Sequence, residues 1–184
     1  MNRKYVKLSK FLSYILRHNP YKYELSLDEK GFTDLNQIIN ILNNHFKDFK
    51  IDKSLLEDLI EASDKKRFQI IDKKIRAYYG HSVPHKIQLI ELNYIPEMLY
   101  HGTTKKAYQK IKFDGLKRKS RQYVHLSDTI KAAIQVAKRR TNEPIILIIN
   151  AKNAHQEGIK FYKSGDVYLS NSISPIFIET LSEF

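Results

Sequence analysis

The sequence contains no cysteine among its 184 residues. This absence excludes disulfide bonds, thiolate zinc sites and thiol nucleophiles, and it fits a cytoplasmic protein. No apolar run approaches the roughly 18 residues that a membrane-spanning helix needs. The N-terminal stretch MNRKYVKLSKF lacks the continuous apolar segment of a signal peptide. We therefore expect a cytoplasmic protein that does not enter a membrane.

Several common ligand-binding patterns are also absent. Neither Gly-x-Gly-x-x-Gly nor Gly-x-x-x-x-Gly-Lys-Ser/Thr occurs, which argues against a Rossmann dinucleotide site and a P-loop. The seven histidines show no HxH, HxxH or HExxH spacing, and no cysteine is present to complete a ligand set. The sequence therefore predicts no metal site.

Acidic residues are few relative to basic ones. The chain has 20 acidic residues against 32 lysines and arginines, a net charge of +12, and a pI of about 9.6. This excess favours a polyanionic partner, most simply nucleic acid. With 42% hydrophobic residues, the chain can bury the core of one medium domain or two small lobes.

The stretch LSYILRHNP ends the first predicted helix. Residues 8–16 carry an apolar stripe at helical spacing, and Pro20 disfavours helical geometry at the residue before it, so the helix should end near His18. Arg17 and His18 then stand at its C-terminus. Taken alone, they are surface cations that interact favourably with the helix dipole.

Two more helices and a hairpin complete the first half. Residues 31–46 predict a helix with Thr33 as its N-cap, and residues 52–63 predict a shorter one. β-forming residues on both sides of residues 72–74 predict a hairpin. Three helices and a hairpin are the pattern of a winged helix-turn-helix, which docks on nucleic acid or serves as a plain interaction domain.

A linker is expected near residues 82–98, between two prolines. Beyond it the sequence predicts two helices, one stopped by Gly115 and one capped by Ser127 or Asp128. It also predicts strands at IILIIN, VYL and IFIETL. Few helices among many short strands favour an α+β fold over alternating βαβ units.

Four short segments concentrate residues suited to anion binding or proton transfer: LRH, DKKRF, IRAYYGHS, and the pair LYHGTT and SRQYVHLSD. Arginine matches phosphate with a planar fork, and histidine moves protons near neutral pH. Each segment also has a structural interpretation, as a solvated face, the end of a hairpin, or a core histidine. Their combination and order decide between the two interpretations.

In that order, together with GLKRKSRQYVHLS and GIKFYKSGDVYL, the segments resemble the RNA 2′-phosphotransferase family (KptA type), over about residues 8–178. The resemblance implies an N-terminal winged-helix lobe, residues 1–85, that binds RNA. It also implies a C-terminal lobe with an ADP-ribosyltransferase-like fold, residues 86–184, that binds NAD⁺. A monomer is expected.

The resemblance also implies roles for individual residues. The catalytic set would be Arg17, His18, Arg67 and Arg121, meeting the RNA 2′-phosphate. Lys65 and His81 would contact RNA. The residues implied to bind NAD⁺ are His101, Gly102, Thr103, His125, Ser127 and Arg140, with Arg139 competing for the last place.

Two departures from the family pattern stand out. Tyr78 and Tyr79 replace the Asn-Gln pair of the family's RANQGHS, and the asparagine before its C-terminal Gly-Val is not evident around Ser164 and Gly165. Neither departure replaces any of the four proposed catalytic residues.

The family's reaction transfers the 2′-phosphate from RNA, with tRNA the family expectation, to NAD⁺. It proceeds through an ADP-ribosylated 2′-phosphate and yields 2′-OH RNA, nicotinamide and ADP-ribose 1″,2″-cyclic phosphate. Two alternatives stay open at this point. One is an ADP-ribosyltransferase that acts on terminal phosphates of RNA or DNA. The other is a non-catalytic winged-helix protein that binds nucleic acid.

Overall fold

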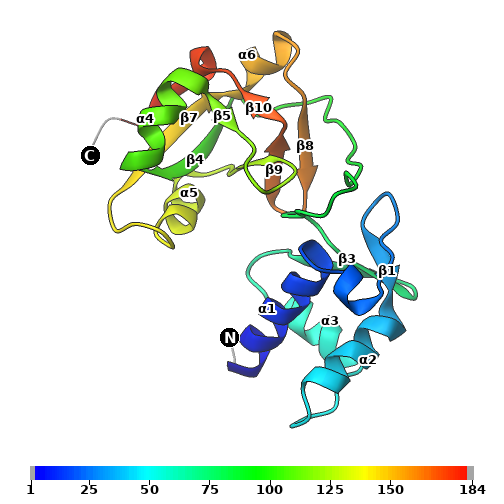
Figure 1. Ribbon diagram of the computed structural model, residues 1–184. Coiled ribbons are helices and arrows are strands. Elements are labelled where there is room, and N and C mark those ends of the chain that lie inside the picture. Colours follow the sequence, from blue (N-terminus) through cyan, green and yellow to red (C-terminus); the bar gives the residue numbers. More distant parts are fainter. Residues whose placement is uncertain (1–2, 182–184) are drawn as a thin grey trace. The chain divides into compact units, whose positions relative to one another are not determined.

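The computed structural model describes residues 3–181. The chain divides into two compact units, Met1–Gln88 (unit 1) and Leu89–Phe184 (unit 2) (Figure 1). Each unit has a hydrophobic core of its own. The ends of the two expected lobes, residues 1–2 and 182–184, lie outside the described residues. The assignment of lobes 1–85 and 86–184 stays a prediction.

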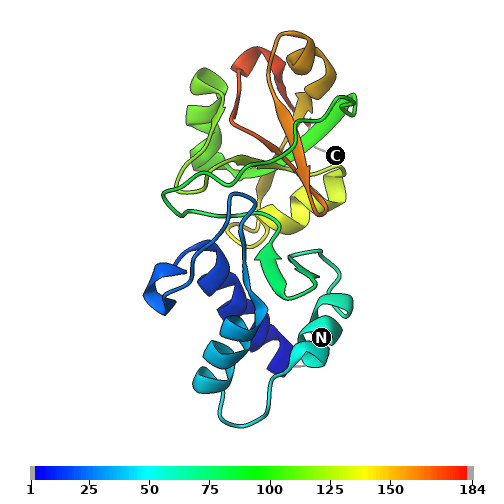
Figure 2. The ribbon, with the colours of Figure 1, turned by 90° about the vertical axis from the view of Figure 1, so that its right-hand side faces the viewer.

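Unit 1 combines three α-helices with a small antiparallel sheet of strand order β1-β3-β2 (Figure 2). Its elements are α1 (Arg3–Arg17), the 3₁₀ turn η1 (Tyr21–Tyr23), β1 (Phe32–Asp34), α2 (Leu35–His45), α3 (Lys53–Glu61), β2 (Phe68–Ile71) and β3 (Lys74–Ala77).

Helix α1 ends where the sequence predicts. Leu12 and Ile15 of its apolar stripe are fully buried in the core of unit 1. At the end of the helix, the backbone N–H groups of His18 and Asn19 both donate to the carbonyl oxygen of Tyr14, at 3.1 Å. This shared bond satisfies a terminal carbonyl that the interrupted helix would leave open.

The N-cap of α2 is Asp34, and the expectation of Thr33 was wrong. Asp34 accepts a hydrogen bond from the N–H of Gln37 at 2.8 Å. Thr33 instead lies in β1, buried and paired with Ile75 of β3. Because the chain stays extended through residue 34, only Asp34 is placed to cap the helix.

The predicted hairpin is confirmed. β2 and β3 pair antiparallel with Phe68 opposite Ala77 and Ile71 opposite Lys74. Asp72 turns the chain with a positive φ of 52°. The third strand, β1, was not predicted, because it is only three residues long.

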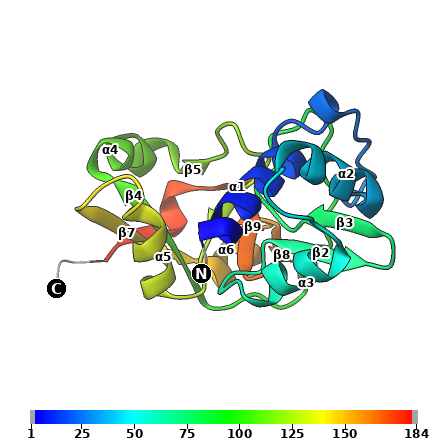
Figure 3. The same cartoon turned by 90° about the horizontal axis from the view of Figure 1, so that it is seen from below.

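Unit 2 contains three small antiparallel sheets, of strand orders β11-β7-β4, β6-β9-β8 and β10-β5. Its elements are β4 (Met98–Thr104), α4 (Lys105–Asp114), β5 (Leu116–Lys117), β6 (Val124–Leu126), α5 (Ile130–Ala137), β7 (Pro144–Asn150), α6 (Ala151–Gln156), β8 (Phe161–Ser164), β9 (Val167–Ser170), β10 (Ser172–Ile173), the 3₁₀ turn η2 (Pro175–Phe177) and β11 (Ile178–Thr180). Figures 1 and 3 show α4 and α5 on opposite sides of β4 and β7.

The helix boundaries of unit 2 correct one prediction and confirm another. Helix α4 ends at Gly115, as expected, with a φ of +73°. Helix α5 is capped by Thr129, whose hydroxyl accepts from the N–H of Ala132 at 3.2 Å. The expectation of Ser127 or Asp128 was wrong, because the backbone of Ser127 still pairs with a neighbouring strand.

The predicted strands at IILIIN and VYL are confirmed by β7 and β9, whereas the start of IFIETL belongs to η2. Helix α6 was not predicted, because its six residues are too few for a periodic pattern. Six α-helices and antiparallel sheets among residues 3–181 agree with the α+β class. The winged-helix and ADP-ribosyltransferase-like descriptions of the two lobes stay predictions. Among the described residues, no helix has the length and apolar character that crossing a membrane requires.

Candidate active site

In unit 1, the end of α1 is joined to residues 80–82. The N–H of Ser82 donates to the carbonyl oxygen of Arg17 at 2.9 Å. The Nδ1 atom of His18 lies 2.8 Å from the hydroxyl oxygen of Ser82. The predicted segments LRH and GHS, distant in sequence, are therefore brought together. The side-chain contact orients the His18 ring, which is otherwise exposed.

Aromatic rings hold the guanidinium of Arg17. Its central carbon lies 5.0 Å from the ring centre of Tyr79 and 5.7 Å from that of Phe68. Gly80, with a φ of +91°, leaves room for the side chain, because a Cβ there would lie 3.4 Å from Arg17 Cδ and Nη1. Cation–π contacts of this kind contribute about 0.5–1 kcal/mol each, and more when desolvated. Tyr79, which belongs to the first of the two departures from the family pattern, therefore helps to hold the side chain of Arg17 in place.

Arg67 and Lys65 lie at the base of the hairpin. The carbonyl oxygen of Arg67 accepts from the N–H of Tyr78 at 2.9 Å, which closes the hairpin one residue before β2. Arg67 directly precedes Phe68, whose ring is one of the two that lie beside the guanidinium of Arg17. Both Arg67 and Lys65 are half-buried.

His81 is buried, with 4% of its surface exposed. Burial, followed by the nearby charges of Arg17 and His18, lowers its pKa to about 3. The ring is therefore neutral at physiological pH and lies inside the fold of unit 1. Its role as an RNA contact stays a prediction, and its burial counts against direct contact.

In unit 2, two strands bring the predicted histidines together. Tyr100 of β4 and Ser127 exchange two backbone hydrogen bonds of 2.8 Å, which joins β4 to the end of β6. Beside this bridge, Nδ1 of His101 lies 2.9 Å from the carbonyl oxygen of His125. Nδ1 of His125 lies 3.0 Å from the carbonyl oxygen of Tyr123.

These contacts determine which nitrogen carries the proton on each ring. A carbonyl oxygen only accepts, so Nδ1 must donate in both cases. In a neutral ring, Nε2 is then an acceptor. Burial lowers the pKa of His101, the bond to the His125 carbonyl opposes this, and the charge of Lys119 lowers the pKa further. A neutral His101 therefore offers an acceptor suited to a hydroxyl group such as that of a ribose.

Gly102 has a packing role. A Cβ at this position would overlap the carbonyl oxygen of Ala133 and lie 2.7 Å from the Cβ of Ala137. The glycine therefore lets α5 pack closely against β4. Thr103, the next residue, is 7% exposed. Any contact of Gly102 or Thr103 with a cofactor stays a prediction.

The remaining arginines lie on the surface of unit 2. Arg121 is exposed in the loop before β6, and Arg139 and Arg140 are exposed just after α5. The N–H of Arg140 donates to the carbonyl oxygen of Ala137 at 2.9 Å. Arg140 as a cofactor contact, with Arg139 as its alternative, stays a prediction. The expected convergence of Arg121 with the arginines of unit 1 stays a prediction.

Comparison with known proteins decides the family. A family model described as "RNA 2'-phosphotransferase, Tpt1 / KptA family" matches residues 3–172. The chain belongs to this family. Proteins named "Probable RNA 2'-phosphotransferase" are similar to it: one from Acetivibrio thermocellus is 47% identical, covering 95% of this chain and 96% of the relative. One from Bacillus thuringiensis subsp. konkukian is 45% identical, with 95% and 94% covered. One from Flavobacterium johnsoniae is 41% identical, with 97% and 98% covered. The family resemblance expected from the sequence is therefore confirmed.

Proposed function

We propose that this RNA 2′-phosphotransferase family member removes the 2′-phosphate from RNA, with tRNA the expected substrate, and transfers it to NAD⁺. The observation that carries the proposal is the family match over residues 3–172. The products would be 2′-OH RNA, nicotinamide and ADP-ribose 1″,2″-cyclic phosphate. An ADP-ribosylated 2′-phosphate would form on the way.

The phosphate would be received by Arg17, His18 and Arg67, with Arg121 as the fourth group. A phosphate dianion is bound by several hydrogen-bond donors that point at it. Ordering a long side chain as such a donor costs conformational entropy. The rings of Tyr79 and Phe68 restrict the guanidinium of Arg17, so less of that cost remains when phosphate binds. This geometry supports the arginine as a phosphate ligand.

The dinucleotide would bind to unit 2, beside His101 and His125. The ring of His101 donates Nδ1–H to a carbonyl oxygen, which leaves its Nε2 to accept from a ribose hydroxyl. NAD⁺ supplies an electrophilic ribose carbon whose leaving group, nicotinamide, departs as a neutral molecule. The residues of unit 2 would bind and orient that ribose, which is the main requirement of the first step because the attacking phosphate is already anionic.

The second step makes different demands. Attack of the ribose 2″-OH on phosphorus builds charge on the phosphate oxygens as the RNA 2′-OH leaves. Arginines directed at those oxygens would stabilise the transition state electrostatically. His18, oriented by Ser82, would donate to a phosphate oxygen or assist a proton transfer.

The test is incubation with an oligonucleotide that carries one internal 2′-phosphate, with and without NAD⁺. The proposal predicts that the RNA loses its 2′-phosphate only when NAD⁺ is present, with one nicotinamide released per phosphate removed. RNA that keeps its phosphate and gains a stable ADP-ribose would favour the alternative, an ADP-ribosyltransferase. Loss of phosphate without NAD⁺ would contradict the proposed acceptor.

A further inference from the structure

The positive charge of unit 2 is concentrated in one segment, Lys105–Arg121, which spans α4, β5 and the loop toward β6. We call it the basic segment. It contains eight lysines and arginines and one acidic residue, a net charge of +7. Residues 89–184 as a whole contain 15 basic and 9 acidic residues, a net charge of +6. The rest of unit 2 is therefore slightly acidic, so the segment differs from its surroundings.

The lysines of α4 lie on its solvent side. Tyr108 and Ile111 pack against the core of unit 2 from the other side of the helix, whereas Lys106 and Lys112 are exposed. Within α4, Lys110 pairs with Asp114 at 3.9 Å, with 82% of the lysine side chain exposed. An ion pair this exposed contributes little, so the charges of α4 remain available to a polyanion.

An exposed aromatic ring lies among these lysines. Phe113 is 75% exposed, and the ammonium of Lys112 lies 4.8 Å from its ring centre. A single exposed apolar side chain is normal on a protein surface, so the significance of this ring lies in the cations around it. Aromatic rings interleaved with cations are the pattern that binds single-stranded nucleic acid, because bases stack on the rings while cations follow the backbone.

The basic segment is firmly attached to the fold. Gly115 turns the chain after α4, and a Cβ there would overlap the carbonyl oxygen of Ile173. Leu116 then pairs with Ile173, and Lys117 with Ser172, in the β5–β10 ribbon. Figures 1 and 3 show β5 following α4 at the edge of unit 2. A surface fixed in this way binds with less loss of backbone entropy than a flexible tail.

One end of the segment lies close to the candidate dinucleotide site. The charge of Lys119 acts on the ring of His101, and Arg121 leads into β6, which carries His125. RNA bound along the segment would therefore pass near the residues proposed to orient the reacting ribose.

We propose that the basic segment binds single-stranded RNA, with Lys106, Lys112 and Lys119 on backbone phosphates and Phe113 stacked on a base. The inference rests on the proposed function in taking RNA as the partner. It adds a binding surface on unit 2 to the contacts expected in unit 1. The surface favours RNA over an anionic membrane, since the exposed residues beside Phe113 on α4, Gln109, Lys110 and Lys112, are polar and offer no wide apolar face to insert.

The test measures binding of a single-stranded RNA without a 2′-phosphate, in the absence of NAD⁺, so that the result does not depend on catalysis. Lys106→Gln/Lys112→Gln should reduce the slope of log affinity against log salt by about 1.4, from about 0.7 per phosphate contact. At 0.1 M salt this corresponds to a loss of about 25-fold. Phe113→Ala should weaken binding at least about fivefold and leave the slope unchanged, because stacking releases no counterions.

Two control variants separate this surface from general charge and hydrophobicity. Lys131→Gln/Lys152→Gln removes two exposed lysines of unit 2 outside the segment, and Tyr94→Ala removes a ring that is 85% exposed. Both should bind RNA as the unmodified protein does. Equal losses in test and control variants would overturn the proposal. Binding of phosphatidylserine vesicles that depends equally on Phe113 would also overturn it, in favour of a membrane surface. Intact RNA binding without phosphate transfer would count against the proposed function alone.

Discussion

Acidification should destabilise unit 1 through one buried side chain, His81. Its ring is 4% exposed, and its pKa in the folded protein is about 3, against 6.5 for an ordinary histidine. Burial is the main cause of the low pKa, and electrostatic interactions with Arg17, His18, His85 and Arg76 lower it further. Gly31 packs close by, since a Cβ there would lie 3.4 Å from Nε2 of the histidine.

The direction in which stability changes with pH follows from proton binding. Between pH 6.5 and about 3, the unfolded chain binds a proton at His81 and the folded chain does not. The contribution of neutral His81 to the free energy of unfolding is therefore fully present above pH 6.5, and it is lost progressively as the pH decreases through this window. Each pH unit within it costs about 1.4 kcal/mol. Between pH 7.5 and 4.5, the loss from this one group is about 2.7 kcal/mol, a large part of a typical stability.

The assay is urea denaturation at pH 7.5 and 4.5, followed by hydrogen exchange in unit 1, for the unmodified protein and for His81→Gln. Glutamine removes the titration, and other ionisable groups contribute to both proteins. The stability difference between them should shift by about 2.7 kcal/mol in favour of the variant at pH 4.5. An equal difference at both pH values would refute the reasoning, because His81 would then titrate as an exposed histidine does.

Four further predictions follow from individual contacts. Gly102→Ala should cost about 1–3 kcal/mol in denaturation experiments, because its Cβ would force α5 away from β4; an unchanged Tm would argue against this packing. His101→Ala should weaken NAD⁺ binding in a folded protein, and unchanged affinity by calorimetry would remove His101 from the cofactor site. Arg67→Ala should slow the second step on the order of 100- to 1,000-fold and accumulate ADP-ribosylated RNA on a denaturing gel, with Arg67→Lys rescuing only in part; wild-type turnover would reject the assignment. Tyr79→Leu should reduce turnover about two- to fivefold while Tyr79→Phe retains it, and equal effects of both would mean that the ring does not position Arg17.

The parts of the fold that were predictable depend on local patterns. The stripe of α1 and the stop at Pro20 follow from helical periodicity and proline geometry, and both match the structure. The hairpin follows from β-forming residues on both sides of a polar turn. Pairing between distant residues produced the errors: Thr33 was expected to cap α2, but it pairs with Ile75 of β3, which no local pattern reveals.

In the candidate site, too, local sequence motifs were predictable and tertiary contacts were not. The motifs that carry the family resemblance could be recognised in the sequence, including the residues around Arg17 and His101. The partners of those residues could not, because they come from tertiary contacts: Ser82 contacts His18, and Tyr79 lies beside Arg17. Gly80, between them, was a signal that sequence reasoning could have used, since a glycine in such a stretch often marks a close approach of another chain segment.

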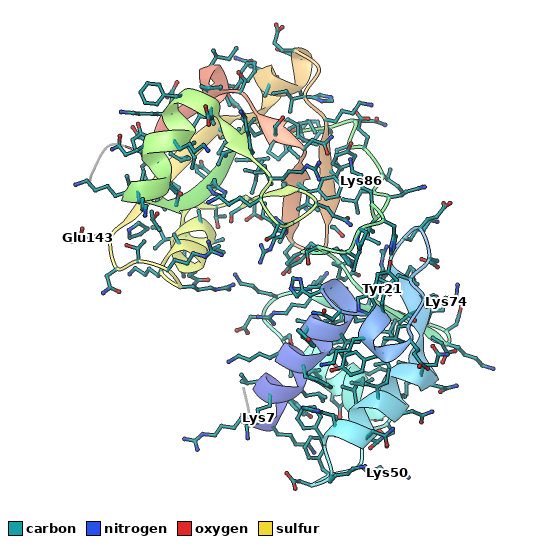
Figure 4. The ribbon with its side chains drawn as sticks, in the orientation of Figure 1. Lys7, Tyr21, Lys50, Lys74, Lys86 and Glu143 are labelled. Carbon is teal, nitrogen blue, oxygen red and sulfur yellow. The ribbon has the colours of Figure 1, made fainter. Side chains whose placement is uncertain are left out.

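Net charge alone does not tell which lysines are exposed and which are paired. In unit 1, Lys7 and Lys50 extend from the surface and Lys74 pairs with Asp28 at 3.3 Å (Figure 4). The sequence favours the lysine-rich first half as the RNA-binding part. The charge of the basic segment of unit 2 can be read from the sequence, but the exposure of its lysines and of Phe113 is known only from the structure.

The destination of the phosphate tests the central claim most directly. An RNA labelled with ³²P at a single internal 2′-phosphate is incubated with the protein and NAD⁺, and the labelled products are separated. The account predicts that the label leaves the RNA and appears in ADP-ribose 1″,2″-cyclic phosphate, and that Arg17→Ala prevents this transfer. Label released as inorganic phosphate, or label that stays on the RNA through the whole reaction, would contradict it.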